Sequence, residues 1–139
     1  MRQAIQTIEV DTNGQGFYDM TPSVMAFVHA QQIDAGLLTL FCRHSSASLL
    51  IQENADPSAL RDLKAFFGRL APEDNALYEH GVEGADDMPA HIRTALTHSH
   101  IVIPVGHGAP MLGQWQGVFL FEHRHQPHRR EIVLHLLGE

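Results

Sequence analysis

A chain of 139 residues with 44% hydrophobic residues is long enough to bury a core, and it predicts one domain over residues 1–139. Its formal net charge is −7 and its Lys and Arg residues are scattered, which argues against nucleic-acid binding. No apolar run is long enough to span a membrane, and the single cysteine, Cys42, excludes an intramolecular disulfide framework. These features favour a cytoplasmic protein.

The first half of the chain reads as alternating strands and helices. The residue pattern predicts strands at residues 4–10, 37–43 and 47–53. A turn is expected at Asp11 to Gly14, and Thr21-Pro22 begins a helix that Gly36 is expected to close. Cys42 shares a strand face with leucines, so we interpret it as a small core residue rather than a nucleophile.

The second half predicts two more helices and three strands. Asp56-Pro57 begins a helix whose buried stripe is expected to consist of Leu60, Leu63, Phe67 and Leu70. Pro89 begins a short third helix, and strands are expected at residues 101–105, 118–121 and 131–137. The fold class is therefore α+β, with two packed antiparallel β layers and a helical layer on one side.

Residues 113–124 contain the only Trp, then an apolar run, and end on Glu122-His123-Arg124. In an extended strand both faces of this run are apolar, which predicts burial on both sides. Burying the carboxylate of Glu122 costs several kcal/mol unless it is paired, hydrogen-bonded or bound to a metal. The sequence thus predicts a partner for Glu122. Arg130 lies at the start of the last predicted strand, and its side chain is also expected to face inward.

An acidic segment without periodicity, residues 73–88, leads into the third helix, and segments of this kind are usually functional or mobile. Within and just after this segment, His80 and His91 flank Glu83, Asp86 and Asp87. The acidic pair could simply favour the positive end of the helix. His91 is expected in the first helical turn, where the neutral, metal-binding imidazole is favoured.

The polar segment His44 to Ser48 is open to three interpretations. Its serines could bond to backbone groups between two strands, or Ser46 could hold a substrate phosphate or hydroxyl. A serine hydrolase based on Ser46 is a third reading, although no G-x-S-x-G motif is present. Arg130 would suit a phosphate or carboxylate because its guanidinium donates two parallel hydrogen bonds.

Five motifs, in this order, resemble those of the YjbQ family, also called uncharacterised protein family 0047: His44 to Leu49, Glu53 to Pro57, Asp87 to His91, Gly113 to Gly117, and Glu122 to Arg124. The chain departs from the family pattern at Ser45 and Gln114, where Thr is usual. The resemblance implies a fold of two β layers with a helical layer, a homotrimer, and a secondary thiamine-phosphate synthase activity. The family's polar positions fall on His44, Ser46, Glu53, Asn54, His80, Asp87, His91, Trp115, Gln116, Glu122 and Arg130.

We therefore expect a metal-assisted enzyme that acts on a small phosphorylated metabolite. His80 and His91 would bind a divalent metal ion, either zinc or magnesium/manganese, with help from Glu122 or His44. Catalytic roles are expected for Glu122, His44 and Asp87, and substrate binding for Ser46, Glu53, Asn54, Trp115, Gln116 and Arg130. The alternatives are a non-catalytic module that binds a small molecule or metal, a purely structural trimer, and the Ser46 hydrolase.

Overall fold

A computed structural model describes residues 1–139 and contains eight strands, three α-helices and one short 3-10 helix. The strands are β1 (Arg2–Thr12), β2 (Gly16–Asp19), β3 (Gly36–Cys42), β4 (Ala47–Glu53), β5 (His100–Gly106), β6 (Ala109–Pro110), β7 (Gln116–Glu122) and β8 (His128–Gly138). The helices are α1 (Thr21–Gln31), α2 (Pro57–Leu70) and α3 (Asp87–Leu96), with the 3-10 helix at Asn75–Leu77.

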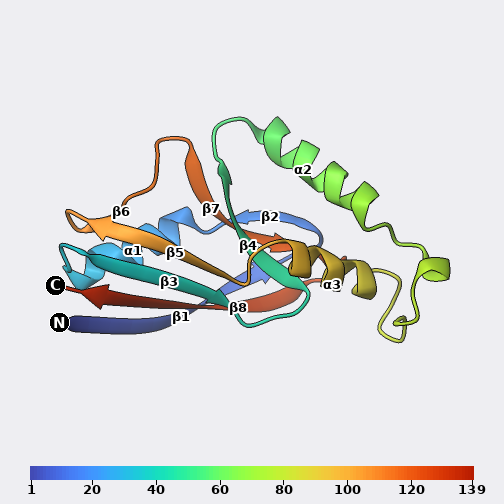
Figure 1. Cartoon of the computed structure of the whole chain (residues 1–139), viewed down its shortest axis with the longest axis horizontal. Helices are drawn as coiled ribbons and strands as arrows, with labels where there is room; N and C mark the ends of the chain where they lie inside the picture. The colour runs from blue at the N-terminus through green and yellow to red at the C-terminus, as the bar shows by residue number, and fades with distance from the viewer.

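The strands form two antiparallel sheets (Figure 1). The larger sheet has the order β1-β8-β3-β5-β6, and the smaller has the order β2-β7-β4. In the smaller sheet Ala47 lies opposite Glu122 and Glu53 lies opposite Gln116, so the two motifs that end β4 and β7 lie at opposite ends of the sheet. The predicted α+β class with two antiparallel layers is confirmed.

One hydrophobic core lies between the inner face of the five-stranded sheet, the three-stranded sheet and α1. The strand β3 shows the alternation clearly, because Leu38 and Leu40 are fully buried while Leu37 and Phe41 are exposed. The strand β7 is buried on both faces from Gly117 to Glu122, as its two apolar faces predict. Cys42 is buried in the same core, as expected.

Helix α1 begins at Thr21-Pro22, but the prediction that Gly36 closes it is wrong. The helix ends at Gln31, and Gln32 adopts the left-handed conformation (φ 52°) that terminates it. Gly36 instead begins β3, where a Cβ atom would lie 2.4 Å from the carbonyl oxygen of Leu137. The glycine is required there by the close approach of two strands rather than by a helix end.

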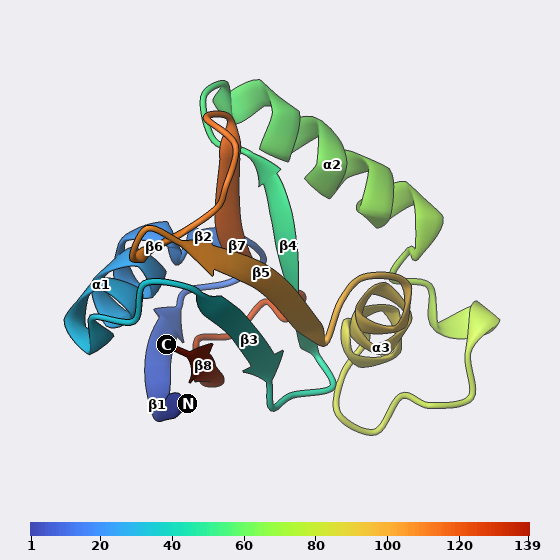
Figure 2. The ribbon, with the colours of Figure 1, turned by 60° about the vertical axis from the view of Figure 1, so that its left-hand side comes forward.

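Helix α2 begins at the predicted position, since the Asp56 side chain accepts a hydrogen bond from the Ser58 N–H at 2.9 Å. The prediction that its apolar stripe is buried is wrong, because no residue of α2 is fully buried and Leu70 remains half exposed. Figures 1 and 2 show the reason: α2 lies along the rim of the molecule, on the far side of β4 and β7 from the larger sheet.

Helix α3 begins at Asp87 and not at the predicted Pro89. His91 therefore lies one full turn after the start of the helix, and the expectation that it sits in the first turn is wrong. The short strand β2 was also not predicted. None of the helices combines the length and the hydropathy needed to span a membrane.

Candidate functional site

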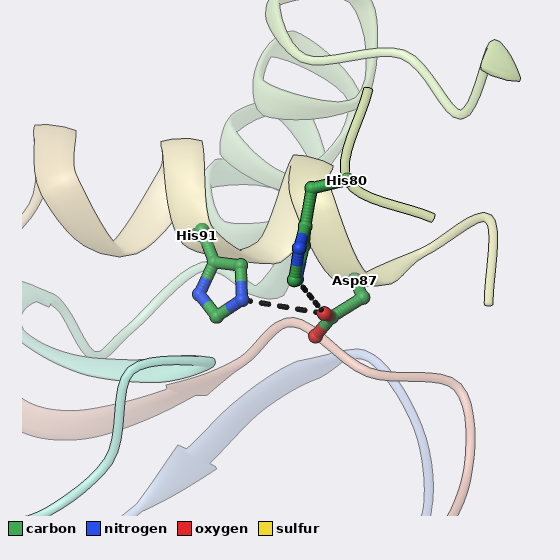
Figure 3. Close-up of side chains that lie close together, drawn as sticks. All are labelled: His80, Asp87 and His91. Carbon is green, nitrogen blue, oxygen red and sulfur yellow. Dashed lines mark hydrogen bonds and ion pairs between the residues drawn. The ribbon is translucent and has the colours of Figure 1, made fainter. Parts of the chain in front are cut away.

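The side chains of His80, Asp87 and His91 converge beside the first turns of α3 (Figure 3). Asp87 and His91 are four residues apart, so they lie on one face of the helix, and the loop before α3 supplies His80. One ligand atom from each of the three lies within 4.8 Å of the others. The Asp87 Oδ2 atom is 2.7 Å from His80 Nε2 and 3.3 Å from His91 Nε2.

The hydrogen bonds of His91 define the state of its ring. Its Nδ1 lies 2.9 Å from the carbonyl oxygen of Ser45, which can only accept, so Nδ1 carries a proton. In the neutral ring Nε2 then has a lone pair, and that lone pair points toward a carboxylate oxygen of Asp87. His91 Nε2 and Asp87 Oδ2 would repel each other unless a cation lies between them. That cation is either a proton on His91 or a metal ion.

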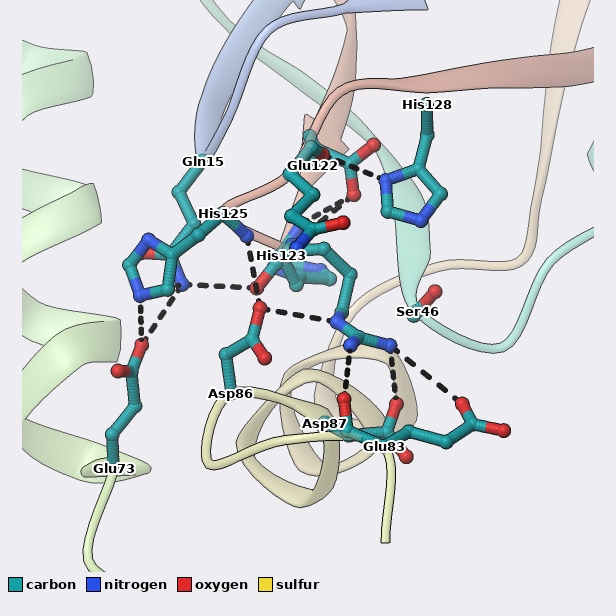
Figure 4. Close-up of polar contacts among 12 residues, drawn as sticks. Gln15, Ser46, Glu73, Glu83, Asp86, Asp87, Glu122, His123, His125 and His128 are labelled. Atoms are coloured by element: carbon teal, nitrogen blue, oxygen red, sulfur yellow. Dashed lines mark hydrogen bonds and ion pairs between the residues drawn. The ribbon is translucent and has the colours of Figure 1, made fainter. Parts of the chain in front are cut away.

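Arg124, for which the sequence predicted no role, holds the carboxylate of Asp87 in place. Its Nη1 donates to Asp87 Oδ1 at 2.8 Å, its Nε donates to Asp86 Oδ2 at 3.1 Å, and its Nη2 donates to the Glu83 carbonyl. Figure 4 shows Glu83, Asp86 and Asp87 together at the start of α3. Burial opposes ionisation of Asp86, but hydrogen bonds from His125 and Arg124 outweigh it and hold its pKa below the usual value.

The three converging side chains fit a divalent metal ion. Two imidazoles and one carboxylate are the ligand types that zinc, manganese and iron accept, whereas magnesium prefers oxygen ligands and water. Three protein ligands leave a coordination position open, which is typical of catalytic rather than structural zinc sites. Ser45 and Arg124 orient His91 and Asp87 from behind, as outer partners of metal ligands do.

Glu122 and Arg130 form a buried ion pair next to this group of ligands rather than within it. The Arg130 guanidinium donates from Nε at 2.7 Å and also from Nη2 to Glu122, and Thr12 Oγ1 donates to the same carboxylate at 2.7 Å. Burial alone would raise the pKa of Glu122, but these hydrogen bonds lower it below the ordinary value. Glu122 thus has the partner that its burial predicted, and Arg130 uses two of its nitrogens inside the protein.

His44 and Ser46 lie close to this ion pair. His44 Nε2 accepts a hydrogen bond from the Glu131 N–H at 2.8 Å, and burial followed by the nearby charge of Arg130 lowers its pKa. The lone pair of His44 is therefore already in use. Ser46 Oγ accepts from Arg130 Nη2 at 3.0 Å and has no imidazole partner, so the geometry does not favour a serine nucleophile at this position.

The remaining predicted site residues form a separate cluster at the other end of the three-stranded sheet. Glu53 and Gln116 are paired there, Asn54 Nδ2 donates to the Gln116 carbonyl, and Trp115 is 59% exposed. Glu122 and Gln116 are six residues apart along β7, so about 20 Å of strand separates the two clusters. Within one chain they cannot contact the same small molecule.

Sequence reasoning also missed His123, which is fully buried behind β7. Its Nε2 lies 2.9 Å from Ser48 Oγ, and its Nδ1 has no hydrogen-bond partner. Burial, and then the positive charge of Arg93, lower the pKa of His123 to about 3, so the ring is neutral. The only sequence signal was the strand alternation that puts His123 on the same face as Phe121.

Comparisons with known proteins agree with this fold and these motifs. A family model described as "UPF0047 protein YjbQ-like" matches residues 6–139. Two similar relatives are UPF0047 protein sll1880 of Synechocystis, 49% identical over 99% of this chain and 94% of that protein, and UPF0047 protein YjbQ of Escherichia coli O157:H7, 39% identical over 96% of this chain and 97% of that protein.

Solved structures match over nearly the whole chain as well. A conserved hypothetical protein, TT1486 from Thermus thermophilus, is 35% identical with a TM-score of 0.83, covering 95% of this chain and 99% of that one. A YbjQ-like protein of unknown function from Sulfolobus solfataricus P2 shares the fold, with a TM-score of 0.87 at 21% identity over 99% of this chain and 100% of that one. The chain described here therefore belongs to the UPF0047, or YjbQ-like, family.

Proposed function

We propose that the protein is a metal-dependent enzyme acting on a small phosphorylated substrate, with His80, Asp87 and His91 as the metal ligands. The observation that carries this proposal is the contact between His91 Nε2 and Asp87 Oδ2 at 3.3 Å, with Nδ1 of the same ring held by the Ser45 carbonyl. Asp87 is only 1% exposed; Arg124 pairs with its Oδ1, and its Oδ2 faces two imidazoles, where a further positive charge would be favourable.

The residues around the ligands support a fixed centre rather than a loose surface cluster. Arg124 fixes one oxygen of Asp87 and leaves the other toward the two imidazoles. A bound divalent metal would supply positive charge to phosphate oxygens in a chain whose net charge is −7. The half-exposed His80 and partly exposed His91 leave the site open to a small molecule.

Metal content is the first test of this proposal. Untagged protein purified without added metal is expected to contain about one zinc, manganese or iron per chain, because the three ligands form one site. The His91→Ala variant is expected to lose that metal, whereas His29→Ala, an exposed histidine on α1, is expected to keep it. Elemental analysis of the three proteins measures this directly, and equal metal in His91→Ala and wild type would refute the ligand assignment.

Substrate screening then separates an enzyme from a binding module. The resemblance implies that hydroxymethylpyrimidine diphosphate and thiazole phosphate are the first substrates to assay, with release of pyrophosphate as the readout. Turnover that requires the metal and disappears in Asp87→Asn would support the enzyme. Stoichiometric metal without turnover on any phosphate ester would instead leave a metal-binding module.

We also propose that the protein assembles as a homotrimer in the cytoplasm. Apolar side chains remain exposed on the outer face of the five-stranded sheet, including Leu37, Phe41 and Val102. A second copy that covers this face could also bring the Trp115 and Gln116 end of one chain toward the metal ligands of another. Such an arrangement would unite the two clusters that are about 20 Å apart in one chain.

A further inference from the structure

A second candidate site lies on the opposite side of α3 from His91. Arg93 follows His91 by two residues, which turns its side chain by about 200° around the helix. It points into a cavity of about 450 Å³ between α2, α3 and the end of β7. Its lining includes Arg61, Lys64, Phe67, Arg93, Phe121 and Glu122.

Arg93 is a buried cation without a counter-ion. It is only 5% exposed, its Nη2 donates to the carbonyl of Ala71 at 2.8 Å, and its Nε has no acceptor. It takes part in none of the protein's ion pairs. Burying a charged guanidinium without a counter-ion costs free energy, and an anion bound beside it would reduce that cost. An anion can approach Arg93 from the cavity.

Two more cations line the same cavity. Arg61 and Lys64 are three residues apart on α2, so they lie on the same face of the helix, and neither is in an ion pair. Among the nine basic side chains, Arg43, Arg124, Arg129 and Arg130 are paired with carboxylates. Of the five that remain, three line this one cavity.

The carboxylate in the lining does not neutralise these three charges. Glu122 is already paired with Arg130, which donates to both of its oxygens. In a chain of net charge −7, a cavity with three free cations is thus a local exception. Phosphate monoesters carry up to two negative charges and several acceptor oxygens, which suits three donors of this kind better than a carboxylate does.

Two aromatic side chains, Phe67 and Phe121, also line the cavity. Phe67 packs edge-on against Phe121 at 5.5 Å between ring centroids, and Phe17 stacks on the same Phe121 ring at 4.1 Å. A lining that combines cations with aromatic rings favours a ligand with an anionic end and a flat apolar end. We propose that this cavity binds a small phosphate monoester that carries an aromatic ring, independently of the metal ligands on the other side of α3.

The chain offers a specific probe, because Lys64 is its only lysine. Reductive methylation with ¹³C-formaldehyde labels Lys64 and the N-terminal amine of Met1, and both keep their positive charge. On titration with phenyl phosphate, the Lys64 methyl resonance is expected to shift and saturate while the Met1 resonance does not move. Inorganic phosphate is expected to bind at least about tenfold more weakly, since it cannot use the aromatic wall.

Variants define the residues responsible. Arg93→Met and Arg61→Ala are each expected to weaken binding by about tenfold or more, because each removes a charge-assisted donor. Arg69→Ala removes the same charge from the same helix outside the cavity and is expected to bind like wild type. Circular dichroism checks that Arg93→Met is folded, and the exposed Arg61 provides the test if it is not.

The titration is done on protein stripped of metal with EDTA and repeated on His91→Ala, so that it is separated from the metal proposal. Binding that persists in both supports a site independent of the metal. An unchanged Lys64 resonance at millimolar phenyl phosphate would overturn the proposal, as would equal affinity in wild type and Arg93→Met. Equal affinity for phenyl phosphate and inorganic phosphate would overturn its aromatic part.

Discussion

For Glu122 the sequence correctly predicted that the buried carboxylate has a partner, but it did not decide between a catalytic and a structural role. Its burial demanded a partner, and Arg130 supplies one from the neighbouring end of β8. Thr12 and two backbone N–H groups donate to the same carboxylate, so its hydrogen-bonding capacity is used within the protein. This geometry favours a structural role for the pair, one that holds together the end of β1, the end of β7 and the start of β8.

Breaking this pair is expected to destabilise the fold more than removing it. Glu122→Gln leaves the guanidinium of Arg130 buried without a charge partner, which costs about 3–5 kcal/mol. The double variant Glu122→Leu/Arg130→Met removes both charges and is expected to be more stable than Glu122→Gln. Urea unfolding of the three proteins measures the difference. A Glu122→Gln protein with wild-type stability but no activity would restore the catalytic interpretation.

His123 predicts a pH dependence of stability. Its pKa is about 3 in the fold and about 6.5 when unfolded, so between these values the unfolded chain binds a proton that the folded chain does not. Stability attributable to His123 is complete above pH 6.5 and falls as the pH drops toward 3, by about 1.4 kcal/mol per pH unit. His44, whose pKa is also lowered, adds a smaller effect of the same sign.

The variant His123→Gln tests this at a single position, because Gln has no charge to gain. Urea unfolding at pH 7, 6 and 5 is expected to show a shallower loss of stability in the variant than in wild type. Exposed His29 is the control, since His29→Ala is expected to leave the slope unchanged. Equal slopes in His123→Gln and wild type would mean that His123 titrates normally in the fold.

At the scale of elements, two glycines are expected to respond in opposite directions to the same change. Gly68 lies in α2 with open space where a Cβ would be, so Gly68→Ala is expected to stabilise the protein by up to about 1 kcal/mol through better helix propensity. Gly36→Ala is expected to destabilise it, because the new Cβ would collide with the Leu137 backbone. Thermal unfolding of both variants measures the signs, and stabilisation of Gly36→Ala would contradict the register of β3 and β8.

The elements that sequence predicts best are those whose pattern is local. Strand β4 occupies the predicted residues, and β3, β5 and β7 differ from prediction by one or two residues at their ends. The start of α3 was missed because Asp87 and Met88 carry no strong local signal before Pro89. The four-residue strand β2 was missed because it begins at Gly16, two residues after Gly14, where both glycines have positive φ, and because it depends on pairing with β7.

In the candidate site, too, the sequence indicated some of the residues and missed others. His80 and His91 were predicted as metal ligands, and the structure brings them together with Asp87, which was predicted as a catalytic residue and not as a ligand. Arg124 and Arg93 were not recognised, because their partners lie far along the chain or are absent from it. The separation of Glu53 and Gln116 from His80, Asp87 and His91 follows from strand direction and register, which a motif list does not contain.

At the scale of the whole molecule, the larger sheet has only one covered face. Its inner face packs on the core, whereas the outer row Leu137, Leu37 and Pro104 crosses three adjacent strands and is exposed. Continuous apolar surface of this kind on a folded protein usually marks an interface. A closed ring of identical copies would cover it in each chain and leave no open edge.

The homotrimer proposal is tested by one substitution at two positions. Val102 lies on the uncovered face, and Val82 lies in the loop before α3 with 97% of its surface exposed. Val102→Lys places a charge where a second copy would have to desolvate it, so the molar mass from light scattering is expected to fall toward that of one chain. Val82→Lys makes the same chemical change and is expected to keep the wild-type mass. In the proposed assembly a second copy would bring the two clusters together, so Val102→Lys is also expected to retain its metal but lose turnover. A wild-type protein with the mass of a single chain would exclude the trimer, and full turnover by a monomeric Val102→Lys would show that one chain carries the complete site.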